Sequence, residues 1–294
     1  MSAGEGRVPD VAALADDPLA RWRFLAARRE AVIGAIRARQ GDPGDYWTAR
    51  AATMGPTMRV DPDAVPAPLE RLLPHVDGAT SVLDVGAGWG RFAIPLARVA
   101  RTVTAVEPSA ALLAHLRANA EVAGLAEGRL RIVAANWEEA TVAPTDLVLC
   151  ANVLTPLADV EPFLRKLDAH TLRRGVIVLR AVAMDGPLVA LWEAIHGVPY
   201  PRETDHTDAL AALHALGIPA RLELAPSSGP IWAFASPDDA RAFARQRLWL
   251  GAPGHDPRAD ALLDEWLATT LIRDGERWRV PAPQPQQALL WWER

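Results

Sequence analysis

Three glycines on alternate positions follow a short apolar run. The run is Val82-Leu83-Asp84-Val85, and Gly86, Gly88 and Gly90 come directly after it. Residues without a Cβ let the main chain approach a ligand closely and adopt positive φ. A second apolar run, 103–106, ends at Glu107. This order of strand, turn, helix, strand and acid predicts a site for a nucleoside-containing cofactor, in which the Glu107 carboxylate accepts hydrogen bonds from the ribose hydroxyls.

The glycine spacing separates two classes of cofactor. A dinucleotide site uses G-x-G-x-x-G, which would place its third glycine at position 91, where this chain has Arg91. A diphosphate also needs an open helix N-terminus, and Trp89 makes that approach bulky. The turn therefore does not favour a dinucleotide.

The pattern hydrophobic-Asp-hydrophobic-G-x-G-x-G closely resembles the first motif of the class I S-adenosylmethionine-dependent methyltransferases. In that family the turn packs against the methionine part of the cofactor, and the acid that ends the second strand holds the ribose. The resemblance therefore implies S-adenosylmethionine as cofactor and covers residues 75–225 most strongly. The residues expected to contact the cofactor around these two motifs are Asp84, Gly86, Ala87, Gly88, Gly90, Glu107 and Pro108.

The ends of the third and fourth predicted strands extend this site. The family usually has an aspartate for the adenine amino group where this chain has Asn136, whose carboxamide oxygen can still accept that bond. Trp137 either covers the adenine face or closes the edge of the core. Asn152 follows the fourth strand and, like the buried Cys150 within it, is expected at the cofactor, while Thr155 is expected at the acceptor.

Residues 152–155 also indicate which kind of acceptor atom is methylated. Methyltransferases that act on nucleic-acid bases and on glutamine use an Asn/Asp-Pro-Pro-aromatic motif at this place. Asn152-Val153-Leu154-Thr155 is not that motif. The sequence therefore argues against methylation of amides and of exocyclic amines.

Candidates for a general base follow the fifth predicted strand. Methyl transfer depends mainly on alignment, and a base helps when the acceptor is a hydroxyl or a protonated amine. Asp185, His196 and His206 are the candidates, and Tyr200 is expected to contact the acceptor. The alternative for His196 is a helix cap beside Gly197. The histidines show no metal-binding spacing, so no metal site is expected.

A helical segment is expected before the cofactor core. It resembles the N-terminal cap of many small-molecule methyltransferases, which carries a tryptophan and an arginine shortly before the first strand. Trp47 and Arg50 occupy these places and are expected to contact the acceptor. Packing of these side chains on the sheet is the alternative.

The remaining pattern alternates strands and helices, as a parallel sheet requires. We expect an α/β, Rossmann-like, doubly wound, mostly parallel seven-stranded sheet. The predicted organisation is a helical cap over 1–75 and a methyltransferase-like domain over 76–294, with a helical insertion at about 236–273. The strands are expected near 81–85, 102–107, 130–134, 145–151, 174–180, 221–224 and 287–292, and the core helices near 90–100, 109–122, 156–169, 187–196 and 206–216.

Composition narrows the class of protein further. The chain has 294 residues, half of them hydrophobic, with one cysteine and a net charge of -5. A disulfide framework is excluded, and no apolar leader or membrane-spanning stretch is visible, so a cytoplasmic protein that binds no membrane is expected. No basic block stands out, which argues against nucleic acid. The oligomeric state is not predicted.

These observations predict a methyltransferase that transfers a methyl group from S-adenosylmethionine to oxygen or nitrogen of a small organic acceptor. A hydrophobic cap suits a small ligand better than a polymer. Two alternatives stay open. The first is a catalytically degenerate cofactor-binding partner or regulator, and the second is an RNA or protein methyltransferase.

Overall fold

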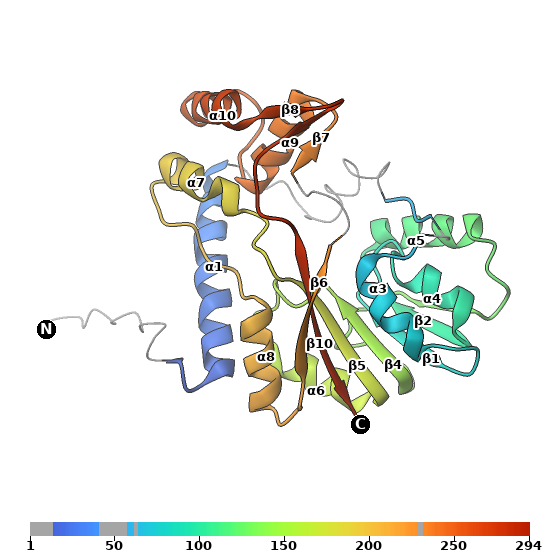
Figure 1. Ribbon diagram of the computed structural model, residues 1–294. Coiled ribbons are helices and arrows are strands. Elements are labelled where there is room, and N and C mark those ends of the chain that lie inside the picture. The colour runs from blue at the N-terminus through green and yellow to red at the C-terminus, as the bar shows by residue number, and fades with distance from the viewer. Residues whose placement is uncertain (1–13, 41–57, 62–63, 228–231) are drawn as a thin grey trace, which may run out of the picture.

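The computed structural model describes residues 14–40, 58–61, 64–227 and 232–294. Within these residues the fold has a central sheet, helices on both of its faces, and a separate cap over one of its ends (Figure 1). No helix among them is long and apolar enough to cross a membrane.

The central sheet has seven strands in the order β3-β2-β1-β4-β5-β10-β6. Strands β1 to β5 are parallel, and β10 is antiparallel to both β5 and β6. The predicted mostly parallel seven-stranded sheet is therefore confirmed. The strands are β1 (Ser81–Val85), β2 (Thr102–Val106), β3 (Leu130–Val133), β4 (Thr145–Ala151), β5 (Thr171–Arg180), β6 (Arg221–Pro226) and β10 (Gln286–Glu293).

Alternate side chains of the strands pack into two cores, one on each face of the sheet. Leu83 and Val85 belong to a core with α1 (Pro18–Gln40), α6 (Glu161–Ala169) and α8 (His206–Ala215). Val82 belongs to the core on the other face. The helices of that second face are α3 (Ala67–Leu72), the 3-10 helix η3 (Leu73–His75), α4 (Ala93–Val99) and α5 (Ala110–Val122).

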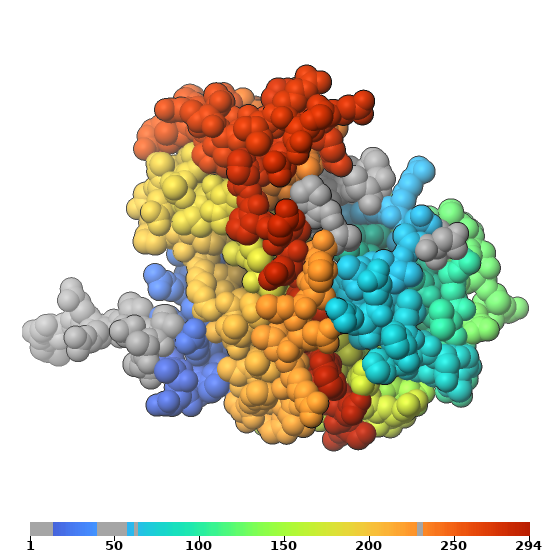
Figure 2. Space-filling view, in the orientation of Figure 1, coloured from blue at the N-terminus to red at the C-terminus, as the bar shows by residue number. Residues whose placement is uncertain are grey.

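A third core forms the cap. Ile33 and Ile36 at the C-terminal end of α1 pack there with α7, α9 and α10, above the carboxyl end of β5 (Figure 1). Figure 2 shows the C-terminal segment covering α7 and then descending as a connector toward β10. The cap elements are the 3-10 helix η4 (Gly186–Leu188), α7 (Val189–His196), α9 (Pro237–Arg247), α10 (Pro257–Thr270), β7 (Ala233–Phe234), β8 (Ile272–Asp274) and β9 (Arg277–Arg279).

The insertion before the last strand differs from the prediction in one respect. It was expected to be helical, but it also contains a small antiparallel sheet of order β7-β9-β8. β8 and β9 form a hairpin in which Asp274 pairs with Arg277, and Gly275 has φ +61° at the first loop position. The hairpin signal in the sequence is the two-residue loop Gly275-Glu276, with glycine at its first position.

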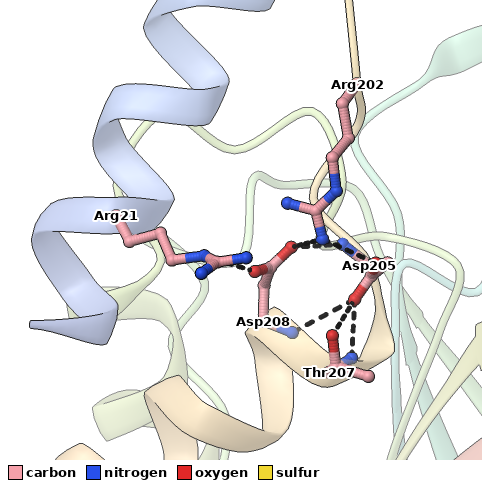
Figure 3. A network of polar contacts seen from close by, with 5 residues as sticks. All are labelled: Arg21, Arg202, Asp205, Thr207 and Asp208. Carbon is pink, nitrogen blue, oxygen red and sulfur yellow. Dashed lines mark hydrogen bonds and ion pairs between the residues drawn. The ribbon is translucent and has the colours of Figure 1, made fainter. Parts of the chain in front are cut away.

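A network of charged side chains joins α1 to α8 (Figure 3). Asp208, 5% exposed, pairs with Arg21 Nε at 3.1 Å and with Arg202 Nη2 at 2.8 Å. Asp205 is the N-cap of α8 and accepts hydrogen bonds from the backbone N–H groups of Thr207 and Asp208. The buried Asp208 carboxylate thus fixes the N-terminal helix α1 to α8.

The predicted division into domains near residue 75 stays a prediction.

Candidate functional site

The glycine turn between β1 and α4 has the geometry that its sequence predicts. Gly86, Gly88 and Gly90 have φ of +73°, +57° and +89°. The backbone N–H groups of Gly86 and Ala87 both donate to the Val106 carbonyl oxygen, at 2.8 and 3.0 Å. These bonds fix the start of the turn to the end of β2.

The three glycines serve different purposes. A Cβ on Gly86 would lie 2.3 Å from Val153 Cγ2, and one on Gly90 would lie 2.5 Å from Leu116 Cδ1. A Cβ on Gly88 would meet no atom within 4 Å. Gly86 and Gly90 are therefore required by packing, whereas Gly88 borders open space in which a ligand can lie against the main chain.

Glu107 stands at the carboxyl end of β2, beside this open space. Its side chain accepts hydrogen bonds from the backbone N–H of Gly88 at 2.8 Å and from that of Ser109 at 2.8 Å. Burial raises the pKa of this carboxyl, and the two N–H donors partly offset that effect. Each carboxylate oxygen retains a lone pair, so the group can still accept hydrogen bonds from two ligand hydroxyls.

Asp84 is 1% exposed in the middle of the sheet. Neither of its carboxylate oxygens accepts a hydrogen bond of good geometry within the described part of the chain. Burial, and secondarily the neighbouring Glu107 charge, raise the pKa of Asp84 to about 7, and the nearby Ala93 backbone N–H partly opposes this rise. A buried carboxyl with so little hydrogen bonding costs free energy, so a cationic ligand nearby would stabilise its ionised form.

The third strand places Asn136 and Trp137 differently. Asn136 is exposed just beyond β3. Trp137 is 4% exposed, and its indole Nε1 donates to the Phe163 carbonyl oxygen at 3.3 Å. The Lys166 ammonium lies 4.6 Å from the centroid of the Trp137 ring. These contacts favour the core-packing alternative for Trp137, while adenine recognition by Asn136 stays a prediction.

The fourth strand ends at a backbone conformation that few residues adopt. Asn152 has φ +57°, and its backbone N–H donates to the Val178 carbonyl oxygen at 2.8 Å. Asparagine is among the non-glycine residues most often found in this region. Thr155 lies partly buried beyond it, whereas Pro108 is exposed and Cys150 is fully buried. Burial raises the pKa of the Cys150 thiol, which agrees with a packing role.

Asp185 and Tyr200 lie in contact with each other beyond the exit of β5. Tyr200 donates its hydroxyl to Asp185 Oδ2 at 2.5 Å. Arg247, at the end of α9, donates from Nε to Asp185 Oδ1 at 2.6 Å and from Nη2 to Oδ2 at 2.5 Å. Asp185 is 4% exposed. A carboxylate paired in this way is poorly suited to take a proton, and its geometry favours a positioning role over the predicted catalytic one.

The two histidines that were predicted as bases differ in their hydrogen bonds. His196 Nε2 lies 2.8 Å from the Leu248 carbonyl oxygen, so Nε2 carries the proton because a carbonyl only accepts. Burial lowers the pKa of His196. His206 begins α8, and its Nδ1 is buried with no partner among the described residues. His206 therefore retains a ring nitrogen that is not engaged in the fold.

Two predicted acceptor contacts, Trp47 and Arg50, lie outside the described residues. The sequence reasoning also missed two residues that the structure places at these sites. Arg247 binds the predicted base, and Asn119 of α5 binds the glycine turn. An asparagine within a helix is a signal for Asn119, since asparagine has a low helix propensity.

Comparisons with known proteins agree with this geometry. Residues 82–175 match the family model described as a methyltransferase domain. A ubiquinone biosynthesis O-methyltransferase from Methylocella silvestris is 34% identical over 134 residues, which is 45% of this chain and 51% of that protein. One from Rickettsia akari is 25% identical over 147 residues, which is 46% of this chain and 55% of that protein. The chain thus spans about half the length of these curated relatives.

A solved structure shares the fold. A candidate methyltransferase from Bacillus halodurans C-125 superposes with a TM-score of 0.52 at 15% identity, over 76% of this chain and 96% of that one. The order of the sheet, the glycine turn and the acid at the end of β2 define the class I methyltransferase fold. Residues 82–175 match a methyltransferase domain within this fold.

The site fits the cofactor of this family. The unpartnered Asp84 carboxyl suits a cation, the Glu107 carboxylate has acceptor capacity for ribose hydroxyls, and the space beside Gly88 leaves room against the backbone. S-adenosylmethionine carries a sulfonium cation and a ribose. The residues that would hold it are therefore present at the carboxyl ends of β1 and β2.

Proposed function

We propose that the protein is a cytoplasmic enzyme that transfers a methyl group from S-adenosylmethionine to an oxygen of a small organic acceptor. The observation that carries this proposal is the Gly86–Gly90 turn with Glu107 bonded to the Gly88 N–H. The matched relatives have names that describe O-methyl transfer, which favours oxygen over nitrogen. The absence of the Asn/Asp-Pro-Pro-aromatic motif at Asn152 supports the same choice.

Within this proposal the chain acts mainly by alignment. When bound, the cofactor supplies an activated methyl group on a sulfonium. Glu107 would hold the ribose, the turn around Gly88 would border the methionine part, and the buried Asp84 would supply negative charge nearby. Holding two reactants in line can supply much of the rate of such a displacement. The protein then has only the acceptor proton left to move.

His206 is our candidate for the group that takes this proton. It begins α8, whose Ala209 packs in the same core as Leu154 at the exit of β4. Its Nδ1 is not engaged by any described residue, whereas His196 Nε2 is bonded to Leu248. A positioned base contributes roughly 10²–10⁴ to the rate when the acceptor is a hydroxyl.

The acceptor is proposed to enter beneath the cap, near the carboxyl end of β5. Val182 and Met184 of the β5 exit line a hollow there with Trp232 and Val280 of the cap. Arg279 and Gln284 also line this hollow, and its volume of about 30 Å³ is far below that of a phenol, so it marks the entrance that we propose and not a formed acceptor pocket.

Titration calorimetry with S-adenosylmethionine and with its demethylated product tests the cofactor assignment. We expect binding by the wild-type protein and loss of binding in Glu107→Ala. Asp77→Ala, which removes an exposed acid at the opposite end of β1, serves as the matched control. No binding to a folded wild-type protein would contradict the proposal.

A transfer assay with labelled S-adenosylmethionine and a panel of small phenols and catechols then tests the activity. We expect transfer that His206→Gln reduces and His196→Gln leaves within a few-fold of wild type. Binding of the cofactor without transfer to any acceptor would support the catalytically degenerate alternative.

A further inference from the structure

Asn119 lies in the interior of α5, and its side chain bonds to two segments distant in the sequence. Its Nδ2 donates to the Met58 carbonyl oxygen at 2.8 Å and to the Trp89 carbonyl oxygen at 2.9 Å. Its Oδ1 accepts from the Val60 N–H at 3.4 Å. Asn119 is 7% exposed. One buried carboxamide therefore joins α5, the segment 58–60 and the glycine turn.

The position of Trp89 gives this contact its importance. Trp89 stands between Gly88, which borders the open space, and Gly90, which packs on Leu116 and Ile94. The Trp89 side chain also packs with Met58 and Leu112 in a small apolar cluster. The carboxamide and this cluster together hold the outer side of the turn, opposite the surface that faces the cofactor.

Helix propensity indicates that Asn119 is retained for these bonds. Asparagine is less favourable than alanine in a helix interior, because its amide competes with the backbone for hydrogen bonds. Both amide protons of Asn119 are instead used outside the helix, on the carbonyls of Met58 and Trp89, to which no described backbone N–H donates. The other three buried positions of α5 are all leucines, namely Leu112, Leu113 and Leu116.

We propose that Asn119 is a positioning residue that fixes the cofactor turn against segment 58–60. This inference rests on the proposed function, since it concerns the same cofactor site. Without the two donors of Asn119, the Trp89 carbonyl would lose its hydrogen bond. The adjacent Gly88 N–H would then no longer be held in the orientation that donates to Glu107. Cofactor affinity would fall even in a protein whose sheet is intact. Binding at the turn and order in segment 58–60 would also be coupled, because such coupling is reciprocal.

The test compares cofactor affinity in three variants of α5. Asn119→Ala removes both donors, and Asn119→Asp keeps the shape while placing a carboxylate beside the two carbonyls. Ala118→Gly is the matched control, since position 118 is exposed on the same helix and the change lowers helix stability without touching the turn. Affinity for S-adenosylmethionine is measured by calorimetry, and stability by urea unfolding.

We expect Asn119→Ala and Asn119→Asp to lower the affinity about tenfold or more, as loss of a buried hydrogen bond does. Ala118→Gly should stay within twofold of wild type. Acidification should bring the affinity of Asn119→Asp closer to that of the wild type at the same pH, because a protonated carboxyl can donate one hydrogen bond. Comparison at equal pH removes the effect of Asp84 and Glu107, which titrate in both proteins. Wild-type affinity in Asn119→Ala would overturn the inference.

Hydrogen exchange on the wild-type protein gives a second measurement that needs no variant to fold. Saturation with S-adenosylmethionine should slow exchange of the Val60 amide together with that of Gly88. Protection of Gly88 alone would overturn the inference while leaving the proposed function in place. Failure of the wild-type protein to bind at all would overturn the proposed function, and the role of Asn119 with it.

Discussion

At the scale of single residues, Asp84 and Gly88 are the two residues that we propose to favour a cationic ligand at the turn. Asp84 supplies a buried carboxyl that accepts few hydrogen bonds from the protein. Gly88 supplies open space beside the main chain. Both features reduce the stability of the protein when no ligand is present. A site that binds a cation gains from each of them, because the ligand fills the space and neutralises the charge.

The raised pKa of Asp84 predicts how stability depends on pH. Its carboxyl titrates near pH 7 in the folded protein and near its ordinary value of 3.8 when unfolded. Between these values the folded state binds more protons, so stability is greatest at low pH and falls as pH rises toward 7. The full shift corresponds to at most about 4 kcal/mol.

Urea unfolding of the cofactor-free protein at pH 5 and pH 8 measures this effect. We expect a higher free energy of unfolding at pH 5 in the wild type, and a smaller difference in Asp84→Asn. Glu107, whose pKa burial also raises, contributes with the same sign. If the free energy of unfolding of Asp84→Asn differs between pH 5 and pH 8 as much as that of the wild type, groups other than Asp84 cause the pH dependence.

Gly88 and Gly124 provide a matched pair of substitutions. Both have φ +57°, and a Cβ on either would meet no atom within 4 Å, but only Gly88 borders the proposed cofactor. Gly88→Ala and Gly124→Ala should each lower stability by about 1 kcal/mol, from the positive φ. Only Gly88→Ala should weaken S-adenosylmethionine binding, by tenfold or more in calorimetry. Equal affinity in the two variants would contradict a cofactor beside Gly88.

At the scale of elements, Asp185 joins the exit of β5 to the cap. Arg247 of α9 and Tyr200 both bond to its carboxylate, and Trp232 of the cap donates to the adjacent Met184 carbonyl oxygen at 2.9 Å. Two side chains of the late insertion therefore end on consecutive residues after β5. This arrangement holds the cap over the carboxyl end of the sheet.

Removal of the Asp185 carboxylate should lower the stability of the protein much more than it weakens cofactor binding. Asp185→Asn removes the charge that pairs with the buried Arg247 guanidinium, and breaking a buried ion pair costs about 3–5 kcal/mol. The control is Asp264→Asn in α10, which removes the exposed ion pair with Arg241 of α9. It should change stability by less than about 1 kcal/mol. Affinity for S-adenosylmethionine should stay within twofold in both. A stable Asp185→Asn protein that had lost methyl transfer would restore Asp185 as a base.

At the scale of the whole molecule, the sequence predicts the sheet better than the cap. Apolar runs that end at Val85, Val106 and Ala151 mark strands clearly, because strands buried on both faces are continuously apolar. The small sheet of the cap depends on strands of only two or three residues, which are too short to show an apolar pattern, and Ile272–Asp274 is exposed throughout. In the sequence only the Gly275-Glu276 loop indicates this small sheet.

The candidate site likewise contains residues that the sequence predicts and residues that it does not. Gly86, Gly88 and Glu107 follow each other within one strand-turn-helix-strand unit, so local spacing suffices to predict them. The partners of Asp185 and Asn119 come from residues distant in the chain. Arg247 and Met58 are brought to them by tertiary packing, which one sequence without its fold does not reveal.

The helix α1 decides whether the core and the cap unfold together. Trp22 near its start is fully buried in the sheet core, where its Nε1 donates to the Leu157 carbonyl oxygen at 2.9 Å. Ile36 near its end is 1% exposed in the cap core. One continuous helix that belongs to both cores should couple them into a single transition, since neither core can release it without loss of packing.

We therefore expect far-ultraviolet circular dichroism and tryptophan fluorescence to report coincident urea unfolding curves. Ile36→Ala should shift both curves to lower urea by the same amount, for a loss of about 2–5 kcal/mol from a buried cavity. Trp22→Phe, at the other end of α1, should shift both as well, by a smaller amount, because it keeps an aromatic ring and removes the bond to Leu157. An early fluorescence transition in Ile36→Ala with an unchanged dichroism curve would mean that the cap unfolds on its own, and that α1 joins the two parts without coupling them.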